Sequence, residues 1–283
     1  MNSFTQKVPL GGTGLMVSRL GIGSSYGASA SVIEEAVEQG VNYLYWGTIR
    51  RPGFGRAMRN LARRNREGII LTVQSYSRIP RLIGPSVEIA LRRAGLDYFD
   101  ILLLGMRNER PGQAYINAFE RLREQGKVRF LALSTHNRPL LPSLFAEYRA
   151  GKSPYEVFML RYNAVHRGAE RDVFPFVPTE PHPGMIAYTA TRWGDLMNSS
   201  KVPVGETPPT AGDCYRFVLG QPAVDLVLCG PSDRSQMQEA LRALEQGPLP
   251  PDDVKRMQRI GDHIYGRHKP RFKEEGDVTV SSG

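Results

Sequence analysis

The 283-residue chain has few cysteines, few histidines and no long apolar runs. Its two cysteines, Cys214 and Cys229, lie outside any CxxC or CxxH pattern, which argues against a disulfide framework, a zinc site or an iron–sulfur cluster and suits a reducing cytoplasm. The five histidines are scattered, so we expect no metal. No apolar run approaches the roughly 18 residues that span a bilayer, and no secretory pattern opens the chain, so no membrane association is expected.

Other familiar signatures are also missing. The chain has neither a GxSxG nucleophile motif nor a P-loop, and the glycine-rich stretch 12–23 precedes a strand and lacks Rossmann spacing. The formal net charge is +9, but the basic residues are dispersed and form no aromatic-interleaved stripe, so no nucleic-acid partner is expected. Either a solvated basic surface or a small anionic ligand accounts for this charge. The sequence leaves the oligomeric state open.

Short apolar runs recur along the chain and predict strands. They are Val-, Ile- and Leu-rich and too continuous for strands with one solvated face, which indicates strands buried on both faces, as in a parallel sheet. We expect strands over residues 19–23, 42–46, 68–73, 99–104, 128–133, 155–160, 184–188 and 224–229.

Amphipathic stretches between these runs predict helices. Residues 31–40 begin with Ser31 and Glu34 in capping-box spacing and end at a glycine. Further helices are expected over 86–95, 114–126, 139–151, 208–220, 235–247 and 251–265. The repeated strand–helix order favours a closed (β/α)8 TIM barrel that forms one domain over residues 1–266. We expect residues 267–283 to be a polar, disordered C-terminal tail.

Several stretches resemble the aldo-keto reductases, in order and over almost the whole chain. They are LGGTGLMVSRLGIGSS (10–25), AVEQGVNYLYWG (36–47), SVEIALRRAGLDYFDILLL (86–104), REQGKVRFLALSTH (123–136) and GMIAYTATRWG (184–194). The resemblance implies a TIM barrel preceded by an N-terminal β-hairpin. It also implies an NADP(H)-linked oxidoreductase.

The same resemblance identifies residues that this chain has lost. The family's reductases use Asp, Tyr, Lys and His at the ends of successive strands, and the tyrosine donates a proton to the substrate carbonyl. These positions fall on Tyr45, Arg50, Val73 and Gly105. Arginine stays protonated, valine carries no charge and glycine offers only backbone, so the usual acid–base set is absent. Loss of one general acid typically costs about 10²–10⁴-fold in rate. We therefore expect a divergent member with a non-standard active site.

The positions that bind the cofactor in the family are partly kept. Ser134 matches a serine that binds the nicotinamide amide, and Tyr188 matches the aromatic residue that stacks on the nicotinamide ring. Toward the phosphate end the resemblance covers Gly230, Ser232, Gln236 and Glu239, and Arg234 adds a charge suited to a 2′-phosphate. The alternative for this loop is a plain turn and helix cap.

Residues at the predicted strand ends suggest what replaced the lost set. In a closed barrel the carboxyl ends of the strands surround one mouth. That ring is rich in Arg and aromatic residues, which favours an anionic ligand; the candidates are Trp46, Arg50, Arg107, Arg161, Arg192 and Trp193. Tyr76 and His136 are the candidate catalytic groups. Their alternatives are a tyrosine that only covers the mouth and a histidine that bonds to the backbone.

Three kinds of function fit these residues. The first is an NADP(H)-linked oxidoreductase with a rearranged proton donor. The second is a lyase, isomerase or hydrolase that acts on an anionic substrate in the same barrel mouth. The third is a barrel that binds a cofactor or ligand without turnover. Fold alone does not choose among them, because this barrel supports many chemistries.

Overall fold

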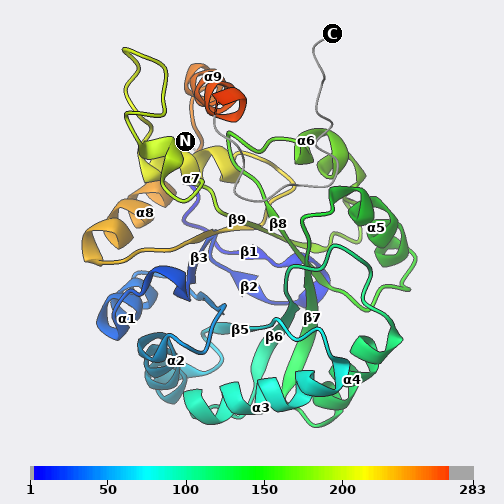
Figure 1. Ribbon diagram of the computed structural model, residues 1–283. Coiled ribbons are helices and arrows are strands. Elements are labelled where there is room, and N and C mark those ends of the chain that lie inside the picture. Colours follow the sequence, from blue (N-terminus) through cyan, green and yellow to red (C-terminus); the bar gives the residue numbers. More distant parts are fainter. Residues whose placement is uncertain (1–2, 268–283) are drawn as a thin grey trace.

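Eight parallel strands close into a barrel in the computed structural model, which describes residues 3–267 (Figure 1). Each strand pairs with its neighbours along the chain, and β10 pairs with β3 to close the ring. The strands are β3 (Leu20–Gly23), β4 (Tyr43–Trp46), β5 (Ile70–Ser75), β6 (Phe99–Leu104), β7 (Val128–Ser134), β8 (Val157–Arg161), β9 (Gly184–Tyr188) and β10 (Leu226–Cys229). The predicted TIM barrel is confirmed. The predicted C-terminal tail lies outside the described residues, apart from Arg267.

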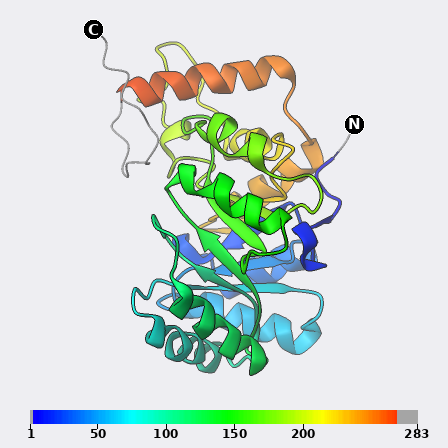
Figure 2. The same cartoon turned by 90° about the vertical axis from the view of Figure 1, so that its right-hand side faces the viewer.

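Helices surround the barrel, as the sequence periodicity predicts. They are α1 (Ala30–Glu38), α2 (Pro52–Asn65), α3 (Ile83–Ala94), α4 (Gln113–Glu124), α5 (Leu141–Arg149), α6 (Ala169–Asp172), α7 (Ala211–Leu219), α8 (Arg234–Gln246) and α9 (Pro251–Arg267). The cap predicted at Ser31 is wrong by two residues, because Ser29 accepts the amide hydrogen bond of Val32. Figure 2 shows α9 lying along the outer edge of the molecule. No described helix is long and apolar enough to cross a membrane.

Two apolar cores lie on opposite faces of the strands. One fills the barrel and includes Ile101, Leu103 and Ile186; the other joins the strands to the helices and includes Leu102 and Leu104. Successive residues of a strand point to opposite faces, so each strand supplies both cores in alternation. This alternation also decides which residues at the strand ends face the mouth of the barrel.

The N-terminal end of the barrel is closed by the predicted hairpin, β1 (Val8–Pro9) and β2 (Met16–Val17). Leu10, Leu15 and Val17 of the hairpin region join the core inside the barrel. Gly11 has φ +52, and its backbone packs so tightly on the start of β9 that a Cβ would overlap the Gly184 amide. With this end plugged, a ligand enters from the carboxyl ends of the strands.

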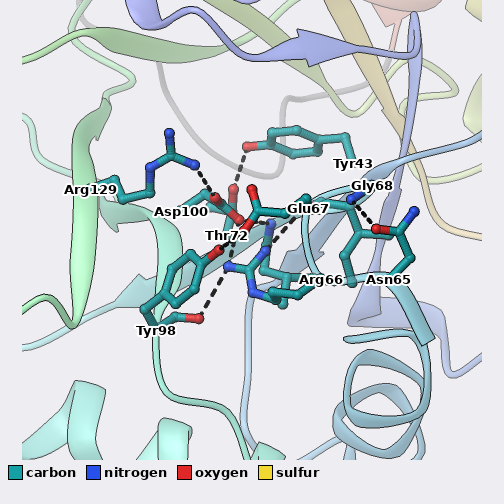
Figure 3. Close-up of polar contacts among 11 residues, drawn as sticks. Tyr43, Asn65, Arg66, Glu67, Gly68, Thr72, Tyr98, Asp100 and Arg129 are labelled. Atoms are coloured by element: carbon teal, nitrogen blue, oxygen red, sulfur yellow. Dashed lines mark hydrogen bonds and ion pairs between the residues drawn. The ribbon is translucent and has the colours of Figure 1, made fainter. Parts of the chain in front are cut away.

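A buried carboxylate ties neighbouring strands together near the plugged end (Figure 3). Asp100 is only 2% exposed, pairs with Arg66 at 2.8 Å and Arg129 at 3.0 Å, and accepts the amide hydrogen of Leu71 at 2.8 Å. A buried carboxylate is tolerated when it is paired and hydrogen-bonded. The cluster therefore stabilises the barrel on the side opposite its mouth.

Candidate active site

A pocket of about 570 Å³ opens at the carboxyl ends of the strands. That volume lies within the range of about 300–1,000 Å³ typical of ligand sites. Strand residues form its floor, among them Gly23, Tyr45, Gln74, Ser134, Met159, Tyr188 and Leu228. Loop residues form its rim, among them Tyr26, Tyr76, Met106, Trp193 and Met197.

The pocket brings together most of the residues selected from the sequence. Tyr76 and His136 both line it. The remaining predicted residues in its lining are Ser134, Tyr188, Trp193, Gly230, Ser232, Gln236 and Glu239. Arg234 lies elsewhere: its side chain is 65% exposed, and its guanidinium pairs with Glu35 of α1.

Strand alternation corrects one of the predicted binding residues. Tyr45 faces the barrel and lines the pocket, whereas the next residue, Trp46, points into the helix-facing core. Trp46 is 1% exposed, and its ring packs 6.5 Å from that of Phe99. A side chain on that face of β4 cannot reach a ligand in the mouth, so the prediction that Trp46 binds substrate is wrong.

The same alternation identifies a pocket residue that sequence reasoning did not select. Val73, aligned with the family's lysine, packs in the helix-facing core, whereas Gln74 faces the pocket. Val73 and Gln74 pair in register with Leu102 and Leu103, which lie in the helix-facing core and the barrel core respectively. The signal was present in the sequence, because the face of a strand residue follows from its parity.

Tyr45 of the pocket floor and Tyr76 of the rim interact through their hydroxyl groups. Burial raises the pKa of Tyr45 well above 10, and the interaction with Tyr76 raises it further. Burial also raises the pKa of Tyr76, but the hydrogen bond with Tyr45 acts in the opposite direction. Both phenols are therefore protonated at neutral pH, and Tyr45 is placed to donate to the Tyr76 oxygen. Tyr76 is 52% exposed, which leaves it open to a ligand.

A second pair of polar groups, Tyr188 and His136, joins β9 to the turn after β7. The Tyr188 hydroxyl lies 3.3 Å from His136 Nε2. Burial and the charge of Arg161 lower the pKa of His136 to about 4, so its imidazole is neutral at pH 7. Burial raises the pKa of Tyr188 to about 12, while a hydrogen bond with Ser134 opposes the rise. Tyr188 thus keeps its proton, and its hydroxyl donates a hydrogen bond to Nε2 in the tautomer of His136 that carries its proton on Nδ1.

The loop after β10 forms the other end of the pocket. Gly230 admits the Tyr26 ring, which a Cβ at 230 would overlap. Gln236 accepts the Ser232 amide hydrogen at 2.9 Å, and Asp233 caps α8 by accepting the Gln236 amide hydrogen at 3.0 Å. Glu239 accepts the Ala211 amide hydrogen at 2.9 Å and so holds the start of α7. The loop's own side chains therefore hold its backbone through these hydrogen bonds.

These residues fit a nicotinamide dinucleotide best at the Tyr188 end. There, a buried serine hydroxyl and a tyrosine ring line a continuous space that runs to the 230–236 loop. At the opposite end the Ser232 amide would have to exchange Gln236 for a phosphate oxygen. Among the described residues, no group of three or more His, Cys, Asp or Glu is placed to hold a metal ion.

The predicted ring of arginines around the mouth does not form. None of Arg50, Arg107, Arg161 and Arg192 is among the described residues that line the pocket, which corrects that prediction. Arg50 is exposed on the surface, and Arg192 pairs with Asp195 at 3.0 Å. Arg107 donates to the Ser77 carbonyl and to the Tyr115 hydroxyl. Buried guanidinium groups need hydrogen-bond acceptors, and the acceptors of Arg107 and Arg192 are groups of the rim and not a ligand.

Positive charge gathers instead behind one wall of the pocket. Arg161, the last residue of β8, is buried with its guanidinium carbon 6.0 Å from the centroid of the Trp193 ring. Burial lowers the pKa of His166 to about 3, helped by the charges of Arg161 and Arg192. The charge of Arg161 acts on His136, which lines the pocket, although no cation stands in the described lining.

The rim contains backbone conformations that side chains rarely adopt. Met106, Thr189, Arg192 and Trp193 have φ values of 53, 63, 50 and 56, in the left-handed region. Such conformations cost roughly 1–3 kcal/mol each and concentrate at ligand sites. Three of these residues line the pocket, which supports its assignment as the functional site.

Comparisons with known proteins bear on the fold and on the class of protein. No family model matches the chain. It is 25% identical to an uncharacterized oxidoreductase, YqkF, of Bacillus subtilis, over 93% of this chain and 99% of that protein. It is also similar to the aldo-keto reductase AKR11C1 from Bacillus halodurans, whose holo form has a TM-score of 0.73 at 22% identity. The apo form has a TM-score of 0.72 at 24% identity, and both comparisons cover 93% of this chain and 99% of the other. These comparisons show that the chain has the fold of the aldo-keto reductase AKR11C1.

Proposed function

We propose that this protein is an oxidoreductase of the aldo-keto reductase type, linked to NADP(H) and working with a non-standard active site. One observation carries the proposal: Tyr76, with Tyr45 behind it, lines the same pocket as Ser134 and Tyr188. A proton donor and a nicotinamide platform thus share one space. The names of the similar proteins support the same class of reaction.

Tyr76 is the proposed proton donor. Its raised pKa keeps the phenol protonated at neutral pH, and its exposure lets a carbonyl oxygen reach it. When the proton leaves, the hydrogen bond from Tyr45 stabilises the phenolate that remains, the role for which the family uses a lysine. A bound nicotinamide dinucleotide supplies the hydride. His136 is the second candidate donor, but its neutral ring already interacts with Tyr188.

The pocket lining favours an uncharged substrate over the anionic one expected from the sequence. Glu239 is the one Asp, Glu, Lys or Arg among its described lining residues, and it is engaged with the start of α7. The rim is aromatic and thioether-rich, with Tyr26, Met106, Trp193 and Met197. Burying this apolar surface against an apolar part of a ligand would make the free energy of binding more favourable. This composition weighs against a lyase, isomerase or hydrolase of anionic substrates.

Cofactor binding is the first test of the proposal. Titration with NADPH and NADH should quench the fluorescence of Trp193, which lines the pocket, with little response from buried Trp46. Arg234 is the candidate residue for binding the 2′-phosphate of NADPH. Its guanidinium would have to break the ion pair with Glu35 to reach that phosphate. Arg234→Ala should then weaken NADPH more than NADH. Arg242→Ala, an exposed arginine on the same helix, is the matched control.

Turnover distinguishes an enzyme from a binding protein. NADPH oxidation should be measured with benzaldehyde and with 4-carboxybenzaldehyde, which differ in charge. Faster turnover of the neutral aldehyde supports the proposal. Binding of NADPH without turnover of either aldehyde would favour a ligand-binding barrel, and no binding of either dinucleotide would reject the oxidoreductase. The cytoplasmic location belongs to the same proposal; buried Cys214 and Cys229 are both free thiols, which suits it.

A further inference from the structure

Gln74 and Gly105 share one volume at the floor of the pocket. A Cβ built on Gly105 would coincide with the side-chain amide of Gln74. The two residues come from adjacent strands, and the Gly105 amide donates to the Ser75 carbonyl at 3.2 Å. Gly105 is the position that aligns with the family's histidine. The amide of Gln74 therefore occupies the space in which that histidine side chain would begin.

The Gln74 side chain is well suited to meet a ligand. It lines the pocket and is partly exposed, and no described residue is recorded as a hydrogen-bond partner of its amide. Alternation along β5 turns Gln74 toward the mouth, two residues before Tyr76 in the chain. An amide offers two N–H donors and an oxygen acceptor without any charge.

We propose that Gln74 donates a hydrogen bond to the carbonyl oxygen of the substrate, from the space that Gly105 leaves open. The inference rests on the proposed function and adds a residue that fixes where an uncharged carbonyl compound binds. In this proposal Gln74 on β5 makes the contact with the substrate that the histidine after β6 makes in the family. Because the amide does not ionise, this contact favours neutral carbonyls at any working pH.

Equilibrium binding tests the contact independently of turnover. The probes are benzamide, which carries a carbonyl that is not reduced, and toluene, which has the ring without it. Both are titrated against the full chain in the presence of NADP+, with Trp193 fluorescence as the signal. Gln74→Ala should weaken benzamide about fivefold more than toluene, the factor expected for one neutral hydrogen bond. Gln74→Glu should also weaken benzamide more than toluene, because a carboxylate cannot donate to the carbonyl oxygen.

Two further variants decide whether Gly105 and Gln74 act together. Gly105→Ala should displace the amide and reproduce the selective loss seen in Gln74→Ala. The double variant should be no worse than Gln74→Ala alone, since residues that share a space are not additive. Ser75→Ala is the control: its hydroxyl interacts with Ser86 of α3, so ligand binding should not change. Melting curves check that every variant folds.

The outcomes are distinct. Equal weakening of benzamide and toluene, additive losses in the double variant, or no benzamide binding to the wild-type chain would each overturn the role of Gln74. The proposed function is tested separately by calorimetric titration of the wild-type chain with NADP+. If NADP+ does not bind, the proposed function is wrong. Benzamide binding that depends on Gln74 without dinucleotide binding would keep the carbonyl site and reject the oxidoreductase.

Discussion

The hydroxyl of Tyr188 lies 3.3 Å from Nε2 of His136, across β8, whose last residue is Arg161. The bond couples two neutral groups next to a buried cation. Burial lowers the pKa of His136, and the positive charge of Arg161 lowers it further. The imidazole is therefore neutral, and one of its ring nitrogens is a hydrogen-bond acceptor. The pair connects the proposed nicotinamide end of the pocket to the proposed substrate end.

Acid should weaken the fold through His136. Its pKa falls from 6.5 to about 4 on folding, so the unfolded chain binds the proton first and stability falls as pH drops between these values. From pH 7 to pH 5 the loss from this group is about 2 kcal/mol. Urea unfolding at both pH values should show a smaller loss in His136→Gln. His263→Gln, on α9, should behave as the wild type; equal acid sensitivity in His136→Gln would contradict the shift.

Removing the phenol at position 76 should affect chemistry more than binding. Tyr76→Phe is expected to lower kcat by about 10²–10⁴-fold with little change in KM, because it removes the proton donor. Tyr45→Phe should lower kcat about tenfold, since it removes only the hydrogen bond to the phenolate. Steady-state kinetics with a neutral aldehyde is the measurement. Tyr98→Phe, near the plugged end of the barrel, is the control; an active Tyr76→Phe would exclude Tyr76 as the donor.

Loss of the buried carboxylate near the plugged end should destabilise the barrel without changing its mouth. Asp100→Ala removes partners from Arg66, Arg129 and the Leu71 amide, and should cost about 3 kcal/mol in free energy of unfolding. Denaturant unfolding measures the loss, and NADPH titration should be unchanged. A loss below about 1 kcal/mol would mean that water replaces the carboxylate readily.

The position of α9 should depend on one glycine. A Cβ on Gly261 would overlap the backbone carbonyl of Ala164, so Gly261→Ala must push α9 away and should cost about 1–3 kcal/mol. Gly266→Ala, on the same helix with open space around its Cα, should instead stabilise by about 0.5 kcal/mol. Thermal unfolding of both variants gives the comparison. Equal effects would show that α9 is not held by this contact.

Local patterns in the sequence were enough for the framework of the fold. All eight barrel strands were predicted within a few residues, because buried parallel strands are short, continuous apolar runs. Helix α2 (Pro52–Asn65) was not predicted: it begins with proline and glycine and is rich in arginine, so its apolar face is thin. No helix was predicted between β8 and β9, and that link holds only the short α6 and a single 3-10 turn.

At the site, the sequence determined which residue types stand near the strand ends, and the tertiary structure decided which of them meet. Tyr76 and His136 were selected from their position after predicted strands, and Ser134 and Tyr188 from the resemblance to the aldo-keto reductases. All four line one pocket. Trp46 and the four arginines also stand near predicted strand ends, so their place in the sequence did not distinguish them from residues that line the pocket. Strand parity turned Trp46 into the core, and carboxylate and backbone acceptors held Arg192 and Arg107 away from the pocket. Strand parity alone turns Gln74 toward the mouth, but only the tertiary structure shows that its amide fills the space beside Gly105, because that space lies between two strands and not along one.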